Sequence, residues 1–323
     1  MLRIGAVGHL NLDIYVKVDR LPEPDSRETC IEHYMSVGGA ATNYSITLTK
    51  IGVESHLFVA RGTDIIGDLL ETTLLNMNVK IHSKKVEEHT GMVIVIVDRK
   101  GIKYMISIPG ANKKLEITER DLDIMRTLDH VHVVVSEPDV LMRVIQKMHD
   151  ISSISLGYRT ETARLGVRFL MSLDVRFRMM FLNRPEAEML FNARSIDDIR
   201  RGCRFLIDEV SKCEEIVVTL GEEGSVIYGK GGLELRIPAF KVEAIDTTGA
   251  GDVFAAAYTF SRLVGLDHGD SGTLASAYAA LKCTRRGASN VPEVEDVLRF
   301  LHDNGYHVLV DKVRNIFSRK VNL

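Results

Sequence analysis

Short runs of β-branched and apolar residues alternate with longer amphipathic segments along most of the chain. Strands show a period of two or a continuous apolar run, whereas helices repeat apolar residues every three or four positions. Alternation of the two is typical of βαβ units, which build a mostly parallel sheet covered by helices. The predicted strands are Arg3–Val7, His56–Ala60, His130–Val135, Ser153–Leu156, Met179–Phe181, Glu215–Leu220 and Ser225–Gly229. The predicted helices are Ala40–Ile51, Gly67–Asn76, Pro138–His149, Thr160–Ser172, Pro185–Phe191, Asp197–Glu209, Val253–Leu263, Ser271–Thr284 and Glu293–Asn304.

Four further strands form two pairs, and the two strands of each pair follow one another without an intervening helix. The second pair flanks the turn Asp98–Gly101, which is typical of a β-hairpin. We therefore expect one domain over residues 1–323, with a small antiparallel sheet from residues 12–36 and 90–110 inserted into the α/β core. From the pattern alone, this sheet is either a lid over a site or an interaction surface. Its predicted strands are Leu12–Val18, Glu28–Tyr34, Gly91–Val97 and Ile102–Ile108.

Composition excludes several classes of protein. The formal net charge of −3 over 323 residues disfavours a nucleic-acid-binding protein, which usually carries a basic surplus. The longest apolar run, Met92–Val97, is far shorter than the ~20 residues that cross a bilayer. The four cysteines form no CxxC pair, which favours free thiols in a reducing cytoplasm. We expect a cytoplasmic protein with neither nucleic-acid nor membrane partners, and composition leaves enzyme and binding protein open.

A glycine-rich turn, Gly249-Ala250-Gly251, opens the predicted helix that follows Asp252. Free amide groups and the positive end of the helix dipole make such a turn a phosphate site. A carboxylate at Asp252 would repel phosphate, so it suits a general base that takes a proton from an attacking hydroxyl. The alternative is that Asp252 only caps the helix and that the glycines form an ordinary turn. The residues alone leave both interpretations open.

A second glycine pair, Gly38-Gly39, also precedes a helix, and Asn43 lies in its first turn. Paired glycines permit a close approach to the backbone, although for this motif taken alone a tight strand-to-helix turn is the favoured explanation. Asn11 and Asp13 follow the first strand, where ligands contact open parallel sheets. On an extended chain they share one face and suit sugar hydroxyls, or they are solvated loop residues.

Together these segments resemble the ribokinase-like (PfkB) carbohydrate kinases along nearly the whole chain. DTTGAGD is similar to the family's C-terminal signature and VGGAATN to its N-terminal one. LNRPEAEML resembles the N-x-x-E segment, VVTLGEEG the nucleotide strand, and TRRGASNVP the loop near the adenine and monovalent-cation sites. The resemblance implies a three-layer α/β/α sandwich with a mostly parallel sheet and a small antiparallel lid. It also implies ATP-dependent phosphoryl transfer to an alcohol.

The resemblance also assigns roles to individual residues. It implies Asp252 as the base, an anion hole at Gly249–Asp252, and Mg²⁺ organised through Asn183 and Glu186. It implies K⁺ as a further cofactor, and a homodimer formed through the lid. The implied substrate contacts are Asn11, Asp13, Gly38, Gly39, Asn43, Asn112 and Glu137. The implied ATP contacts are Asn183, Glu186, Thr219, Gly221, Gly224 and Ser276, and the implied monovalent-cation ligands are Asp246, Thr248 and Asn290.

The substrate is less defined than the reaction. The contacts resemble those of ribokinase and favour a sugar or polyol, but Asn11-x-Asp13 and the glycines recur in nucleoside kinases and keto-deoxy sugar kinases. Residues Ser155-Leu156-Gly157 depart from the family's Asp-Pro, and the cation loop is one residue shorter than in ribokinase. A nucleotide-binding protein without turnover is a second class, disfavoured by Asp252. A third class, a nicotinamide-dependent oxidoreductase, is disfavoured because the sequence lacks the G-x-G-x-x-G fingerprint of that class.

Overall fold

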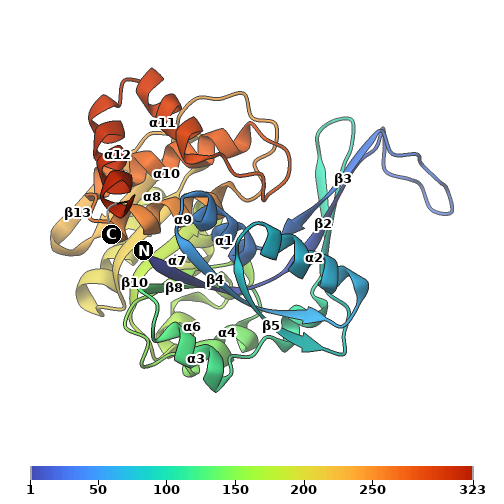
Figure 1. Cartoon of the computed structure of the whole chain (residues 1–323), viewed down its shortest axis with the longest axis horizontal. Helices are drawn as coiled ribbons and strands as arrows, with labels where there is room; N and C mark the ends of the chain where they lie inside the picture. Colours follow the sequence, from blue (N-terminus) through green and yellow to red (C-terminus); the bar gives the residue numbers. More distant parts are fainter. Residues whose placement is uncertain (1, 322–323) are drawn as a thin grey trace.

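A nine-stranded sheet forms the centre of the protein in the computed structural model, which describes residues 2–321 (Figure 1). The strand order is β13-β12-β11-β10-β9-β8-β1-β4-β5. Strands β11 to β5 in this order are parallel, while β12 and β13 extend one edge in antiparallel fashion. The strands are β1 (Arg3–Gly8), β4 (Glu54–Gly62), β5 (Lys80–Val86), β8 (His130–Val134), β9 (Ile154–Gly157), β10 (Phe177–Asn183), β11 (Cys213–Thr219), β12 (Ser225–Gly229) and β13 (Leu233–Ile237).

Helices cover both faces of this sheet, which confirms the predicted three-layer sandwich. One buried apolar cluster joins the sheet to α1, α2 and α9–α12, and a second joins its other face to α3–α8. The helices of the first face are α1 (Ala40–Lys50), α2 (Ile65–Asn76), α9 (Ala250–Leu263), α10 (His268–Cys283), α11 (Val294–Asp303) and α12 (His307–Val321). Those of the second face are α3 (Glu119–Met125), α4 (Pro138–Gln146), α5 (Thr160–Ala163), α6 (Gly166–Ser172), α7 (Arg184–Phe191) and α8 (Ile196–Arg204).

Several elements differ from the sequence prediction. The helix predicted over Thr160–Ser172 is two helices: the first ends at Ala163, and the second starts at Gly166, whose φ of +68° interrupts the helical backbone. The predicted helix Asp197–Glu209 finishes in a π-helical turn, Phe205–Glu209. Strand β5 escaped prediction because its sequence, KIHSKKV, is polar and only half-buried at the sheet edge. Strand β13 and helices α3 and α12 were also not predicted.

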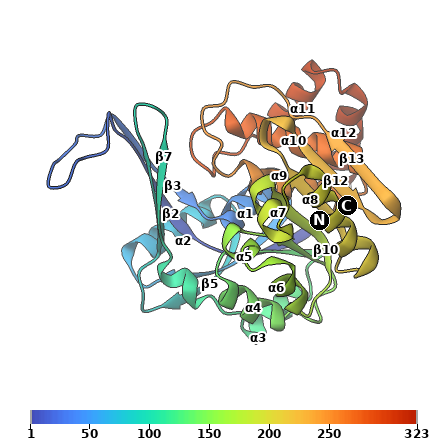
Figure 2. The same cartoon turned by 180° about the vertical axis from the view of Figure 1, so that it is seen from behind.

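The second sheet has the order β3-β2-β6-β7 and stands away from the body in both views (Figures 1 and 2). Strand β2 follows β1 after only two residues, so the lid sheet continues directly from the core. The strand predicted over Glu28–Tyr34 begins four residues later, since pairing with β2 aligns Lys17 with Glu32 and Asn11 with Gly38. The strands are β2 (Asn11–Lys17), β3 (Glu32–Gly38), β6 (Gly91–Val97) and β7 (Lys103–Ile108).

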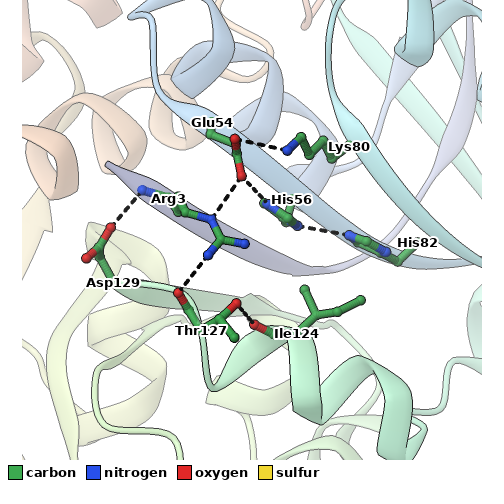
Figure 3. Close-up of polar contacts among 8 residues, drawn as sticks. All are labelled: Arg3, Glu54, His56, Lys80, His82, Ile124, Thr127 and Asp129. Carbon is green, nitrogen blue, oxygen red and sulfur yellow. Dashed lines mark hydrogen bonds and ion pairs between the residues drawn. The ribbon is translucent and has the colours of Figure 1, made fainter. Parts of the chain in front are cut away.

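The amino-terminal edge of the main sheet is held by a charged cluster (Figure 3). Glu54 accepts from Arg3 Nε at 2.9 Å, pairs with Lys80 at 2.9 Å, and lies 3.0 Å from His56 Nε2. His56 Nδ1 in turn lies 3.0 Å from His82 Nε2. These residues connect the first residues of β1, β4 and β5, at the amino-terminal ends of these strands.

Within residues 2–321, no helix combines the length and apolarity that crossing a bilayer requires.

Candidate active site

Polar side chains gather at the carboxyl ends of the parallel strands, where open α/β sheets bind ligands. His9 follows β1, Glu137 follows β8, Arg159 follows β9, and Asn183 and Thr219 end β10 and β11. These strands are neighbours in the sheet, so their carboxyl ends lie along one edge. The lid strands β2 and β3 begin and end at the same edge, because β2 follows β1 and β3 leads into α1.

The glycine turn before α9 forms the predicted helix N-terminus. Gly249 is the N-cap residue with a φ of +78°, a left-handed conformation that favours glycine over any residue with a Cβ. Helix α9 begins at Ala250, and a Cβ on Gly251 would meet no atom within 4 Å. The amide groups of this turn therefore have open space beside Gly251 and the positive end of a 14-residue helix behind them. The arrangement can bind an anion.

Asp252 lies in the first turn of α9 and contacts residues from two other parts of the chain. Its Oδ2 accepts a 2.9 Å hydrogen bond from Asn43 Nδ2, and its Oδ1 lies 3.8 Å from Arg159 Nη1. Burial raises the pKa of Asp252, although the charge of Arg159 and the hydrogen bond from Asn43 oppose the rise. A buried carboxylate with a raised pKa is suited to take a proton near neutral pH.

Asp13 lies in β2 with its carboxylate directly against the backbone of β3. A Cβ on Gly38 would come within 2.0 Å of Asp13 Oδ2, so only glycine leaves room for this carboxylate. Burial, together with the charges of Asp252 and Asp246, raises the pKa of Asp13 to about 7. The three carboxylates therefore share one electrostatic environment, in which the lid contributes Asp13. The glycine pair therefore permits a close approach of the Asp13 carboxylate to the backbone, in addition to forming the turn into α1.

The other expected substrate contacts divide into two pairs. Asn112 Nδ2 donates to Asn11 Oδ1 at 2.7 Å, and both side chains are buried. Glu137 Oε2 lies 2.7 Å from His9 Nε2. Burial opposes ionisation of Glu137, but the adjacent His9 outweighs this effect and the pKa of the carboxyl is lowered. Gly39 is the N-cap residue of α1, so it sets the start of the helix that carries Asn43.

Asn183 and Glu186 cap helix α7 reciprocally. Asn183 Oδ1 accepts from the Glu186 amide at 2.9 Å, and Glu186 Oε2 accepts from the Asn183 amide at 2.9 Å. Such a capping box satisfies two free amides of the first turn and fixes both side chains. Burial raises the pKa of Glu186, Arg159 opposes the rise, and Asp252 adds to it. The sequence interpretation as a ligand segment thus coincides with a structural role.

A small cavity of about 70 Å³ joins this cap to the anion site. Its walls include Asn183, Glu186, Thr219, Gly251 and Asp252. A buried carboxylate beside a phosphate site fits Mg²⁺, which is usually held by one or two carboxylates together with waters and substrate phosphates. Within residues 2–321, no group of three or more His, Cys, Asp or Glu side chains forms a metal site by itself. Glu186 therefore fits a metal that arrives with a nucleotide.

The remaining expected ATP residues lie around the turn after β11 and in α10. Thr219 ends β11, and Gly221 and Gly224 form the turn to β12, where the Leu220 amide donates to the Gly224 carbonyl at 2.7 Å. Ser276 lies in α10, and its hydroxyl donates to the Pro238 carbonyl at 3.1 Å. Ser276 therefore ties α10 to the residue after β13, and the same segment lies against Gly224, where a Cβ would come within 2.8 Å of the Pro238 carbonyl carbon.

Asp246 is the centre of a dense hydrogen-bond network. Its Oδ1 accepts from the Thr248 amide at 3.0 Å and hydroxyl at 2.7 Å, and its Oδ2 accepts from the Gly287 amide at 3.0 Å and the Tyr34 hydroxyl at 3.1 Å. Burial opposes ionisation, but the donors of Thr248 and Gly287 and the charge of Lys282 lower the pKa of Asp246. Asn290, the third expected cation ligand, is exposed and lines a groove beside β3.

Comparison with known proteins decides the family, since residues 1–295 match the pfkB family carbohydrate kinase. The chain belongs to this family. It is therefore a phosphotransferase of the sugar-kinase type. An ATP-dependent ribose-1-phosphate kinase of Halopiger xanaduensis is 27% identical over 94% of this chain and 99% of its own length. A nucleoside kinase of Methanocaldococcus jannaschii is 26% identical over 93% of this chain and 97% of its own length.

Solved structures agree with the pfkB assignment. Arabidopsis thaliana ribokinase complexed with ribose and ATP superposes with a TM-score of 0.81 at 23% identity, covering 93% of this chain and 99% of that chain. The Methanocaldococcus jannaschii nucleoside kinase superposes with a TM-score of 0.78 at 25% identity, covering 94% and 99%. The first likeness shows the ribokinase fold.

Three residues of this pfkB kinase site were not identified from sequence. Arg159 lies within reach of Asp252, Tyr34 joins the lid to Asp246, and the fully buried Lys282 donates to the Asp246 carbonyl at 2.8 Å. Arg159 had a usable signal, because it follows a predicted strand just as Glu137 does. Tyr34 and Lys282 had none, since only the folded chain brings them to Asp246.

Proposed function

We propose that this pfkB kinase transfers the γ-phosphoryl group of ATP to a hydroxyl of a ribosyl substrate. The observation that carries the proposal is the meeting of three segments at Asp252. Its carboxylate contacts Asn43 from the first glycine motif and Arg159 from the loop after β9, and it lies beside the amides of the second glycine motif. A base, a cation and an anion site in one place meet the needs of phosphoryl transfer.

Each group has a defined task in this proposal. Asp252 takes the proton from the attacking hydroxyl, while the amides of Gly249–Gly251 hold the transferred phosphoryl group. Arg159, which also lines the cavity, neutralises charge on that group. Asn43 holds the carboxylate of Asp252 through its 2.9 Å hydrogen bond. Glu186 and Asn183 would hold Mg²⁺, which neutralises the phosphates when it is bound.

The substrate side is formed by the lid and α1. The carboxylate of Asp13 can accept hydrogen bonds from two neighbouring hydroxyls, which suits a vicinal diol. Ribose, ribose 1-phosphate and the ribose of a nucleoside all carry such a diol at C2 and C3. The named relatives act on these three kinds of substrate, and each contains ribose. Hexoses also carry vicinal diols, so it is the substrates of these relatives that favour a ribosyl substrate over a hexose or an acidic keto-deoxy sugar.

A substrate panel with Mg-ATP tests the proposal. Ribose, ribose 1-phosphate, adenosine and cytidine are compared with 2-deoxyribose, glucose, myo-inositol and 2-keto-3-deoxygluconate, with ADP formation as the readout. We expect at least one ribosyl compound to be preferred, and its 2-deoxy counterpart to lose most of its kcat/KM. Preference for the keto-deoxy acid, the hexose or the inositol would contradict the ribosyl assignment. If none of the compounds led to ADP formation, the kinase assignment would be contradicted.

We also propose that the protein is a homodimer joined through the outer face of the lid. Strand pairing places Met35, Ile14, Ile94 and Ile106 in one row across the four strands, on the face opposite Asp13 and Tyr34. Met35 is 65% exposed and Ile106 is 52% exposed. A second copy of the same row would cover this apolar face. We expect a dimer mass in light scattering and a monomer mass for a Met35→Lys, Ile106→Lys variant.

The unpaired cysteines bear on the cellular compartment of the protein. Cys203 and Cys213 are buried and unpaired, and burial raises the pKa of the Cys213 thiol to about 12. Unpaired buried thiols are typical of proteins from reducing compartments. We propose the cytoplasm as that compartment.

A further inference from the structure

Lys282 is a buried lysine beside the catalytic turn. It lies in the last turn of α10, its side chain is 0% exposed, and its ammonium donates to the Asp246 carbonyl at 2.8 Å. A lysine is almost never fully buried without a partner that repays the loss of hydration. The unusual position therefore calls for a task that a neutral side chain would not perform.

The segment that Lys282 contacts leads directly into the anion site. Asp246 lies three residues before Gly249, and its carboxylate fixes the amide and hydroxyl of Thr248. The amides of Ile245 and Asp246 both donate to the Cys283 carbonyl, at 2.8 and 3.0 Å. The end of α10 thus holds the backbone of this segment from one side, and the ammonium of Lys282 places a positive charge on it.

The same residues do not fit an additional monovalent cation. Each carboxylate oxygen of Asp246 already accepts two hydrogen bonds. Lys103 Nζ lies 3.7 Å from Asp246 Oδ1, so a second positive group approaches from the lid. A potassium ion here would meet two ammonium groups, and Asn290, the third expected ligand, is exposed in a groove that Tyr34 and Gly287 also line.

We propose that Lys282 is a positioning residue whose ammonium serves as a built-in monovalent cation, so that the kinase needs no potassium. The ammonium holds the Asp246 carbonyl, the carboxylate of Asp246 holds Thr248, and the turn at Gly249 is thereby aligned for the phosphoryl group. This proposal rests on the proposed kinase function for its kinetic test. It also makes a prediction about cation binding that is independent of turnover.

The test compares cations in the wild type and in Lys282→Ala at constant ionic strength. Choline chloride is replaced by KCl, NH₄Cl or methylammonium chloride, and ATP is supplied without sodium or potassium. For the wild type, we expect kcat to change by less than about twofold among these salts, since the charge is already present. For Lys282→Ala in choline, we expect kcat to fall on the order of 10²-fold, as when an anion-hole donor is lost. We expect potassium, ammonium or methylammonium to restore much of that loss.

A matched control separates charge from packing. Lys212 is a second buried lysine, and its ammonium donates to the Leu173 carbonyl on the other face of the sheet. Lys212→Ala should lower the melting temperature without making kcat depend on the cation. If Lys282→Ala does not fold, Lys282→Met provides the test instead: it keeps most of the side-chain volume but leaves no space for a cation, so its loss of kcat should be of the same order in every salt.

Thermal melting gives the readout that does not need turnover. A cation that enters the space left by Lys282 binds only the folded state and therefore raises the melting temperature of Lys282→Ala. The melting temperature of the wild type and of Lys212→Ala should not respond to the cation in this way. A wild type without kinase activity overturns the proposed function but leaves this melting test in place.

Three results would overturn the role of Lys282. One is activation of the wild type by potassium beyond a few-fold, which would reveal a separate cation site. Another is a Lys282→Ala enzyme with wild-type kcat in choline. The third is a loss of kcat in Lys282→Ala that no cation reverses, with a melting temperature that no cation raises, because such a loss reflects packing and not charge.

Discussion

Asn43 Nδ2 donates a 2.9 Å hydrogen bond to Asp252 Oδ2, and this bond joins residues that lie 209 positions apart in the sequence. Each residue belongs to the first turn of a helix that starts at a glycine, α1 at Gly39 and α9 at Gly249. The bond therefore connects the two glycine motifs through their side chains. It fixes the orientation of the carboxylate that we propose as the base.

The first prediction concerns the base itself. Asp252→Asn keeps the shape of the side chain and removes its ability to accept a proton. We expect kcat to fall by about 10²–10⁴-fold, the usual contribution of a general base, while the KM for ATP changes little. Steady-state kinetics with the best ribosyl substrate measures both. A variant that retains kcat near that of the wild type would assign Asp252 to helix capping only.

The second prediction concerns the hydrogen bond from Asn43. This bond favours the ionised form of Asp252 and so opposes the rise in pKa that burial causes. In Asn43→Ala the pKa of Asp252 should rise further, and the acid limb of the kcat/KM profile should move to higher pH. The measurement is a pH profile of both enzymes. Thr42→Ala is a matched control, because the Thr42 hydroxyl donates to the His9 carbonyl, and its profile should keep the wild-type midpoint.

The third prediction concerns Arg159, which lies 3.8 Å from Asp252 and whose charge also acts on Glu186. Removing a charge that stabilises the transferred phosphoryl group costs about 10²–10³-fold in kcat at comparable sites. We expect a loss of that order for Arg159→Ala and partial retention of activity for Arg159→Lys. Arg164→Ala, on the exposed end of α5, is the control and should leave kcat unchanged. Equal kinetics for the alanine variants at 159 and 164 would remove Arg159 from the site.

The parts of the site that sequence predicts are those that local structure determines. Gly249 and Asp252 lie in one helix start, and Asn183 and Glu186 are three residues apart in one capping box, so spacing alone indicates their geometry. The alternation of strands and helices likewise predicts the sandwich. These features depend on neighbouring residues in the chain.

The remainder depends on pairing between distant segments. The space for Asp13 exists only because lid pairing aligns Asp13 with Ser36 and so brings its carboxylate diagonally against Gly38, which has no Cβ. Lys282 reaches Asp246 because the end of α10 packs against that segment, and no residue spacing encodes this contact. Strand β5 is polar because it lies at an edge, so hydrophobic pattern does not reveal it. Burial and long-range register decide these cases.

The fourth prediction concerns stability in acid at the edge shown in Figure 3. Burial lowers the pKa of His82 to about 4, and it also lowers the pKa of His56. As the pH falls from the unfolded-state pKa of about 6.5 toward 4, the unfolded chain binds protons that the folded chain does not. The free energy of unfolding should therefore decrease over this range. Urea titrations at several pH values measure the slope.

A His82→Gln variant should show a shallower loss of stability between pH 6.5 and 4 than the wild type. His149→Gln is the control. His149 is exposed three residues after the end of α4, so its substitution should leave the slope unchanged. Identical slopes for the wild type and His82→Gln would mean that His82 is not buried in its neutral form.

The fifth prediction concerns Asp13, whose pKa burial and the charges of Asp252 and Asp246 raise to about 7. For a raised carboxyl pKa, the stabilisation from protonation is complete below the unfolded-state pKa of about 3.9 and is lost as the pH rises through about 7. At pH 8 the wild type therefore carries a destabilising buried charge that Asp13→Asn lacks. We expect the variant to melt at a higher temperature than the wild type at pH 8, with the difference shrinking toward pH 4. We also expect its kcat/KM for the ribosyl substrate to fall, since the amide offers one acceptor oxygen and a donor group where the carboxylate offers two acceptor oxygens. A higher melting temperature without a loss of kcat/KM would place Asp13 outside the substrate contacts. A lower melting temperature together with a lower kcat/KM would mean that the buried carboxylate stabilises the lid.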